Sequence, residues 1–100
     1  MKIKNFEDID SWQEARNLLN QVYDLTQKEE FSKDWGLKNQ IKRSTISVMS
    51  NIAEGFDRSS DKEFIKFLRI STGSCSEVQS QLYVALDQDY ITREEFDRAY

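Results

Sequence analysis

Apolar residues recur along this chain with the three- and four-residue spacing of amphipathic helices. Four stretches are predicted to be helical: Phe6 to about Lys28, about Asp34 to Gly55 or Phe56, about Ser60 to about Gln88, and Thr92 onward. The polar segments between them, Lys28 to Asp34 and 57–60, are predicted to be loops. No segment alternates polar and apolar residues over the length of a strand.

Short connections between long amphipathic helices favour antiparallel neighbours. We therefore expect an all-α fold, an antiparallel up-down four-helix bundle that forms a single domain over residues 1–100. The fourth helix has room for only two turns, so we expect it to be incomplete in this sequence. The inward positions of the other three helices give the predicted core: Trp12, Leu19, Ile41, Val48, Ile52, Phe64, Leu68, Val78 and Leu82.

Capping residues support several of these boundaries. Ser60 and Glu63 have capping-box spacing, which predicts the start of the third helix, and Thr92 and Glu95 repeat it before the fourth. Asn5 is a candidate start signal for the first helix. Gly55 is predicted to end the second helix as a C-cap.

Helices two and three are unusually rich in small residues, which are poor helix formers but allow close backbone approach. Either the two helices cross tightly within the monomer, or the small residues belong to a subunit interface. The third helix also has a second, partly apolar face that one bundle core cannot use, which favours an oligomer. Phe67, Ile70 and Val84 are the candidate interface residues. The small residues are Ser44, Thr45, Ser47, Ser50, Ala53, Ser71, Thr72, Gly73, Ser74, Ser76 and Ser80.

Composition excludes several chemistries. The absence of histidine argues against Ser-His-Asp and Cys-His catalysis and against most zinc sites. No Gly-rich phosphate-binding motif occurs, and the one cysteine, Cys75, cannot form an intramolecular disulfide. We expect no cofactor, no metal, no membrane segment and a cytoplasmic location, because no apolar run or leader is visible.

Charge is unevenly distributed, although the whole chain carries −4. Residues 1–34 and 75–100 are net acidic, and residues 35–74 carry +3. A basic strip on the third helix could bind phosphates of RNA or DNA, without aromatic residues for base stacking. The alternative is a solvated, salt-bridged face. The candidate residues are Arg58, Lys62, Lys66 and Arg69, with Lys38 and Lys42 as a shorter pair on the second helix.

Several short motifs occur together: Phe6-x-x-Ile9-x-x-Trp12-Gln13-x-Ala15, Gln40-Ile41-Lys42-Arg43, Asn51-Ile52-Ala53-Glu54-Gly55-Phe56-x-Arg58, Glu63-Phe64-x-x-Phe67-Leu68, Gly73-Ser74-x-x-Glu77 and Tyr90-Ile91. As a set they resemble the bacterial four-helix-bundle family first found as proteins encoded in intervening sequences of 23S rRNA genes.

That resemblance implies a ring-like homopentamer. A similar protein, the accessory variability determinant of diversity-generating retroelements, is associated with nucleic acid and a reverse transcriptase. For most of the family no biochemical activity is established. Members usually have Gly before Tyr-Ile, where this chain has Asp89, which tolerates a left-handed cap less well.

The polar motif residues have two interpretations. They could form a binding cluster at the bundle end, or they could be structural, with Glu54 pairing with Arg58 at i,i+4 and Arg43 meeting Glu77 across the helices. Trp12 and Trp35 are expected to be packing anchors, although Trp35, near a helix start, could contact a neighbour. The motif residues are Asn51, Glu54, Gly55, Gly73, Ser74 and Glu77.

These observations favour a non-enzymatic oligomeric scaffold or adaptor. The family resemblance favours a homopentamer, and its protein partner is unidentified. The alternative is a nucleic-acid-binding accessory protein that uses the basic strip on the third helix. An enzyme with paired carboxylates is the least favoured class, because no histidine and no recognisable site accompany Glu54 and Glu77.

Overall fold

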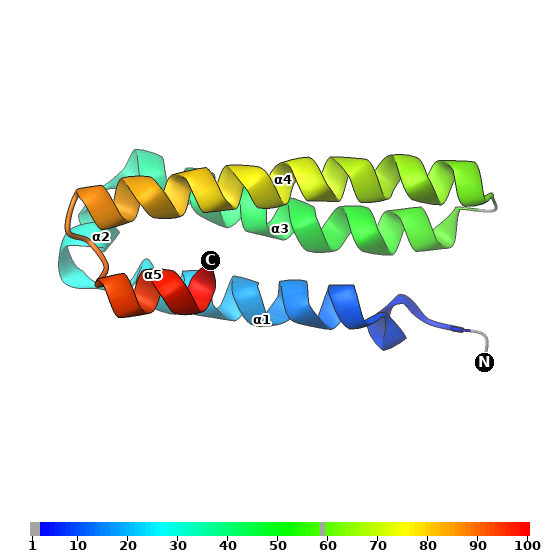
Figure 1. The fold of residues 1–100 in the computed structure, drawn as a ribbon, viewed down its shortest axis with the longest axis horizontal. Coiled ribbons are helices and arrows are strands. Elements are labelled where there is room, and N and C mark those ends of the chain that lie inside the picture. Colours follow the sequence, from blue (N-terminus) through cyan, green and yellow to red (C-terminus); the bar gives the residue numbers. More distant parts are fainter. Residues whose placement is uncertain (1–2, 59) are drawn as a thin grey trace.

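The computed structural model describes residues 3–58 and 60–100, and this part of the chain contains helices and turns but no strand (Figure 1). The predicted all-α fold is confirmed. The elements are a 3-10 turn, η1 (Phe6–Asp8), and five α-helices: α1 (Asp10–Leu25), α2 (Glu29–Lys33), α3 (Trp35–Asp57), α4 (Asp61–Asp87) and α5 (Arg93–Ala99).

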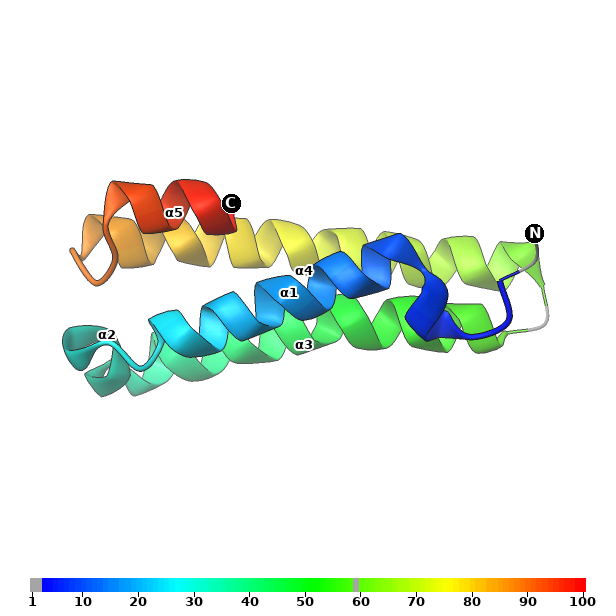
Figure 2. The same ribbon diagram turned by 90° about the horizontal axis from the view of Figure 1, so that it is seen from below.

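Three long helices, α1, α3 and α4, lie along a molecule of 44 × 21 × 18 Å, and α3 runs antiparallel to both α1 and α4. Helix α3 packs against both α1 and α4. Helix α5 turns back along α4 and also contacts α1, so the up-down order of a four-helix bundle is preserved (Figures 1 and 2). Because α5 has only seven residues, it covers only one end of the seam between α1 and α4.

The core agrees with the predicted inward positions. Five of the nine predicted residues are buried: Ile41, Val48, Ile52, Val78 and Leu82. The other four, Trp12, Leu19, Phe64 and Leu68, are half-buried, and none is exposed.

The polar segment after α1 is not a loop, which corrects the prediction. It contains the short helix α2, whose Phe31 is completely buried. Phe31 stacks on Tyr90 with ring centroids 5.4 Å apart, and the Tyr90 hydroxyl donates a hydrogen bond of 2.9 Å to Asp34 Oδ2. A single apolar residue among charged ones gives no helical periodicity, so the sequence pattern could not indicate this packing.

Two predicted helix ends were also wrong. Helix α1 begins at Asp10 rather than Phe6, because Ile9 is extended and separates it from η1. Helix α3 continues past Gly55 to Asp57 and is capped by Arg58. Gly55 is buried inside the helix, where a Cβ would lie 2.8 Å from Phe67 Cβ. It serves close packing rather than chain reversal.

Side-chain caps begin the later helices as expected. Ser60 Oγ accepts from the Glu63 amide, and Thr92 and Glu95 form both bonds of a capping box. Asp34 additionally caps α3 by accepting from the Leu37 amide at 3.0 Å. After α4, Asp89 adopts a left-handed φ of 61°, a conformation that costs a non-glycine residue roughly 1 kcal/mol.

Helices α3 and α4 cross through a row of small polar residues. Ser47 Oγ lies 2.8 Å from Ser74 Oγ, and Ser71 Oγ donates to the Val48 carbonyl at 2.8 Å. Gln81 Nε2 donates to Ser44 Oγ at 3.1 Å. Small side chains therefore allow close approach within the monomer, as one of the two interpretations proposed.

Gly73 is an exception to that interpretation. It is exposed, and a Cβ built on it would meet no atom within 4 Å. Gly73 therefore plays no part in the α3–α4 crossing, and its role in a subunit interface stays a prediction.

The two glycines give a matched pair of alanine substitutions. Gly55→Ala places a methyl group against Phe67 and Phe64 and should lower the free energy of unfolding by about 1–3 kcal/mol. Gly73→Ala meets open space and should raise it by about 0.5–1 kcal/mol, because alanine is the better helix former. Urea unfolding followed by circular dichroism checks both, and equal effects at the two sites would contradict the packing described for Gly55.

An ion pair links the α1–α2 connection to α5. Lys28 Nζ contacts Glu95 Oε1, and Glu95 also accepts from the Thr92 amide at 2.8 Å. The hydrogen bond from Lys28, followed by that from Thr92, lowers the pKa of Glu95 below its ordinary value. Both bonds favour the carboxylate form.

Stability should consequently fall in acid. Since the folded-state pKa of Glu95 is lowered, its contribution is present above the unfolded-state pKa and is lost as the pH falls through the folded-state pKa. We expect Glu95→Gln to destabilise the protein at neutral pH, and its difference from wild type to shrink as the pH falls from neutral through the folded-state pKa of Glu95. Urea unfolding of both proteins across this range checks the expectation, and a difference that stays constant with pH would contradict it.

Candidate functional site

The outward face of α4 carries apolar side chains that the bundle core does not use. Ile65, Ile70 and Val84 are 50%, 44% and 43% exposed. Phe67, the third predicted interface residue, is instead half-buried and lies against Gly55. The predicted interface set is therefore divided between a packing residue and two surface residues.

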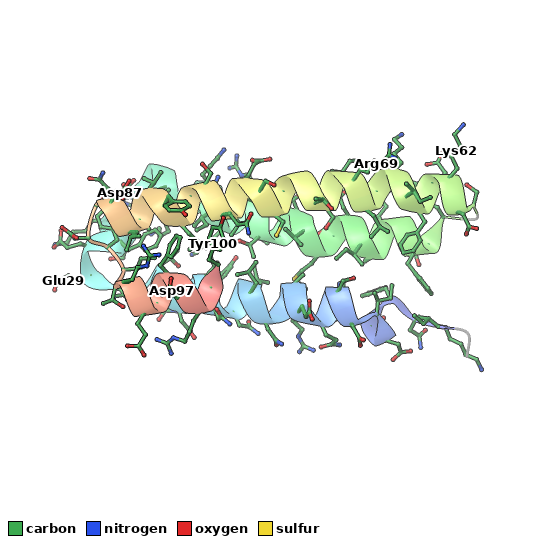
Figure 3. The ribbon with its side chains drawn as sticks, in the orientation of Figure 1. Glu29, Lys62, Arg69, Asp87, Asp97 and Tyr100 are labelled. Atoms are coloured by element: carbon green, nitrogen blue, oxygen red, sulfur yellow. The ribbon has the colours of Figure 1, made fainter. Side chains whose placement is uncertain are left out.

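Three cations of the predicted basic strip share this outward face. Lys62, Lys66 and Arg69 line an open depression together with Ile65, Ile70 and the acidic Glu63. Figure 3 shows Lys62 and Arg69 pointing away from the bundle. Among residues 3–58 and 60–100, none of the three has an ion-pair partner.

Arg58 does not extend that strip. Its Nη2 donates to Glu54 Oε1 at 2.7 Å, and its guanidinium carbon lies 4.9 Å from the centroid of the Phe67 ring. The structure thus shows the expected i,i+4 pair between Glu54 and Arg58. The ion pair with Glu54 and the contact with Phe67 hold the Arg58 side chain at the end of the bundle.

Lys38 and Lys42 lie apart from the α4 strip and beside aromatic rings. Lys38 Nζ lies 3.9 Å from the centroid of the Trp35 ring, and Lys42 Nζ lies 4.5 Å from that of Tyr23. Sequence reasoning treated the two lysines as a pair without aromatic neighbours. It missed Tyr23 because that ring comes from α1, a different helix.

The family motif residues take mainly structural positions. Asn51 Nδ2 donates to the Ser47 carbonyl at 2.8 Å, and Ser74 bonds Ser47 across the α3–α4 crossing. The expected Arg43–Glu77 pair is not formed in the part of the chain that the structure describes. The Ser47–Ser74 and Gln81–Ser44 hydrogen bonds place residue 43 opposite about residues 78 to 82 rather than about residue 72, and the side chains of Arg43 and Glu77 are both exposed.

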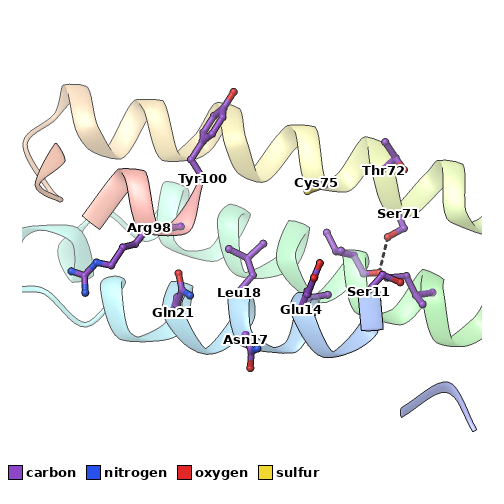
Figure 4. A pocket seen from close by; sticks show the side chains of 14 residues that line it. Ser11, Glu14, Asn17, Leu18, Gln21, Ser71, Thr72, Cys75, Arg98 and Tyr100 are labelled. Atoms are coloured by element: carbon purple, nitrogen blue, oxygen red, sulfur yellow. Dashed lines mark hydrogen bonds between the residues drawn. The ribbon is translucent and has the colours of Figure 1, made fainter. Parts of the chain in front are cut away.

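A groove of about 460 Å³ lies between α1 and α4, next to the end of α5 (Figure 4). Its lining is mainly small, apolar or uncharged, and its charged members are Glu14 and Arg98. Cys75 lies in its wall and is half-buried. One carboxylate without a second carboxylate, histidine or activated nucleophile nearby offers no arrangement for acid–base chemistry.

Metal-binding clusters and membrane-spanning helices are both absent from residues 3–58 and 60–100. No cluster of three or more acidic or cysteine side chains has the grouping a metal ion would need. None of the helices has the length and apolar character required to cross a membrane.

The model of the family described as 23S rRNA-intervening sequence protein matches residues 7–100. No curated protein matches the chain. Since the match spans nearly the whole helical bundle, including η1, the α3–α4 hairpin and α5, the chain belongs to the family of 23S rRNA-intervening sequence proteins.

Proposed function

We propose that this protein is a non-enzymatic, oligomeric scaffold or adaptor that acts in the cytoplasm. The observation that carries the proposal is the outward face of α4, where Ile65, Ile70 and Val84 remain exposed although the bundle core is already filled. Full burial of one such side chain contributes about 1.5–3 kcal/mol, so association of subunits through this face would be favourable.

Family membership supports the same proposal. The match covers residues 7–100, and the resemblance of the motifs implied a ring of five copies. Five copies is accordingly the number we propose. In such a ring each exposed face is repeated around the axis, which turns a weak contact into a multivalent one.

The absence of catalysis is also part of the proposal. The sequence contains no histidine. The carboxylate with a lowered pKa, Glu95, already caps α5 and pairs with Lys28. The groove between α1 and α4 brings together no pair of reactive groups. A protein-binding role therefore fits the available side chains better than a reaction does.

The test is the mass of the protein in solution. Light scattering should give a multiple of the 11.8 kDa chain mass, with five copies expected. Ile70→Asp combined with Val84→Asp should reduce the mass to that of one chain, because two charges would be buried in the contact.

A matched control is available in Ile3, whose side chain is 49% exposed in the segment before η1. Ile3→Asp should leave the mass unchanged, and circular dichroism should show equal helical content in all variants. If light scattering gave the wild-type protein the mass of one chain, the proposal that the protein is oligomeric would be overturned.

A second candidate function is nucleic-acid binding through the α4 strip, favoured by the cluster of Lys62, Lys66 and Arg69 around one depression. Lysine side chains contact phosphates as point charges, so such binding is sequence-tolerant and salt-dependent. Three phosphate contacts per subunit predict a log–log salt slope of about −3 on duplex DNA. The net charge of −4 opposes this binding at long range.

Replacing Lys62, Lys66 and Arg69 together by Gln should abolish retention of duplex DNA or RNA in an electrophoretic shift assay. The control replaces Lys33, Arg93 and Arg98 by Gln, which removes three exposed cations elsewhere and changes the net charge equally. Equal loss in both triple variants would show a general charge effect and contradict the strip. No retention of wild type at low salt would leave only the scaffold.

A further inference from the structure

Aromatic rings and cations alternate along one side of the α1–α3 hairpin. We name this surface the α1–α3 flank and define it by Tyr23, Trp35, Lys38 and Lys42. The two rings each lie within 4.5 Å of a lysine ammonium, measured from ring centroid to Nζ. Near the other end of α1, the Arg16 guanidinium carbon lies 6.0 Å from the centroid of the Trp12 ring, which continues the same combination.

Helical spacing places three of the flank residues together. Trp35, Lys38 and Lys42 are separated by three and four residues, so they lie on one face of α3. Trp35 and Lys42 are about 10 Å apart along the helix axis, at 1.5 Å per residue. Tyr23 joins this face from α1 through its contact with Lys42.

The flank is positively charged over a long stretch. Residues 35–53 of α3 include Lys38, Lys42 and Arg43 and no carboxylate. The carboxylates at the α2 end have partners. Glu29 and Glu30 pair with Lys33, and Asp34 accepts hydrogen bonds from the Leu37 amide and the Tyr90 hydroxyl. A phosphate at the flank would thus meet cations first.

The rings are available to a ligand. Trp35 is 68% exposed and Tyr23 is 37% exposed, so neither is a core anchor. Lys38 covers one part of the indole and also donates to the Ser32 carbonyl at 3.1 Å, which fixes its ammonium beside the ring. Most of the remaining Trp35 surface is open to solvent.

We propose that the α1–α3 flank binds single-stranded nucleic acid, with bases stacking on Trp35 and Tyr23 and phosphates contacting Lys38 and Lys42. Exposed rings interleaved with cations are the arrangement by which proteins hold single strands without reading sequence, and each stacked base contributes about 1–3 kcal/mol. A duplex offers phosphates but keeps its bases stacked inside. The flank should for this reason prefer single strands.

This inference rests on the second candidate function but assigns it a different surface. The α4 strip has no exposed aromatic ring among its lining residues, whereas the flank has two. The two surfaces make different predictions. Binding at the α4 strip should have similar affinity for single strands and duplexes, whereas binding at the α1–α3 flank should have higher affinity for single strands.

The experiment measures fluorescence anisotropy of labelled oligo(U), oligo(dT) and a duplex of the same length, at about 50 and 200 mM salt. Wild type should bind the single strands more tightly than the duplex. Trp35→Ala should weaken single-strand binding about 5- to 100-fold, the equivalent of one lost base stack, and Trp35→Phe should retain most of it. Lys42→Gln should reduce the magnitude of the salt slope by about 0.7.

The triple substitution of Lys62, Lys66 and Arg69 by Gln serves as the comparison and should leave single-strand affinity unchanged. Loss of single-strand binding in that variant, with no effect of Trp35→Ala, would overturn the flank and leave the strip as the site. No binding of any oligonucleotide at low salt would overturn both.

A third outcome concerns protein contacts. If Trp35→Ala lowered the mass of the assembly and no oligonucleotide bound, the flank would be a subunit contact and the proposal would be overturned. The proposed oligomer contact through Ile70 and Val84 is tested separately by the aspartate variants of these two residues.

Discussion

The close packing of α3 on α4 is the constraint on which the rest of the structure depends. Gly55 leaves just enough space for Phe67 and Phe64, and four serines and a glutamine bridge the two helices by hydrogen bonds. Side chains of this size bring the backbones close while satisfying polar groups that would otherwise be buried without partners. The two longest helices are fixed by this contact, and α1 and α5 pack onto the hairpin they form.

The contact also decides which surfaces remain outside. With Ser71, Ser74 and Val78 of α4 turned toward α3 and the core, the opposite side of α4 must present Ile65, Ile70 and its cations to solvent. At the other end of the molecule, Phe31, Tyr90 and Asp34 join α2 to the α4–α5 turn. The carboxylates of α2 at this end are paired with Lys33, and the adjoining α1–α3 flank carries cations beside exposed rings. Each surface therefore has a distinct chemistry.

Candidate sites were harder to predict from the sequence than the fold was. The strip of Lys62, Lys66 and Arg69 lies on one helix, so its spacing alone predicted that the three would project together. Arg58 shares the spacing but pairs with Glu54, which the i,i+4 spacing of these two residues also indicated. The flank combines Tyr23 of α1 with Lys42 of α3, a meeting that depends on how two helices are rotated against each other.

The sequence by itself determined the three long helices, the start of α5, their order, part of the core and the capping residues at Ser60 and Thr92, because periodicity and caps are local properties of the chain. The tertiary structure alone decided that Gly55 packs against Phe67 instead of ending α3, that the buried Phe31 lies in a short helix, α2, within a polar segment, and that Arg43 and Glu77 form no ion pair. Each of these depends on the distance and register between separate helices. Such registers are set by side-chain volumes on both partners at once, and no periodicity within one helix encodes them.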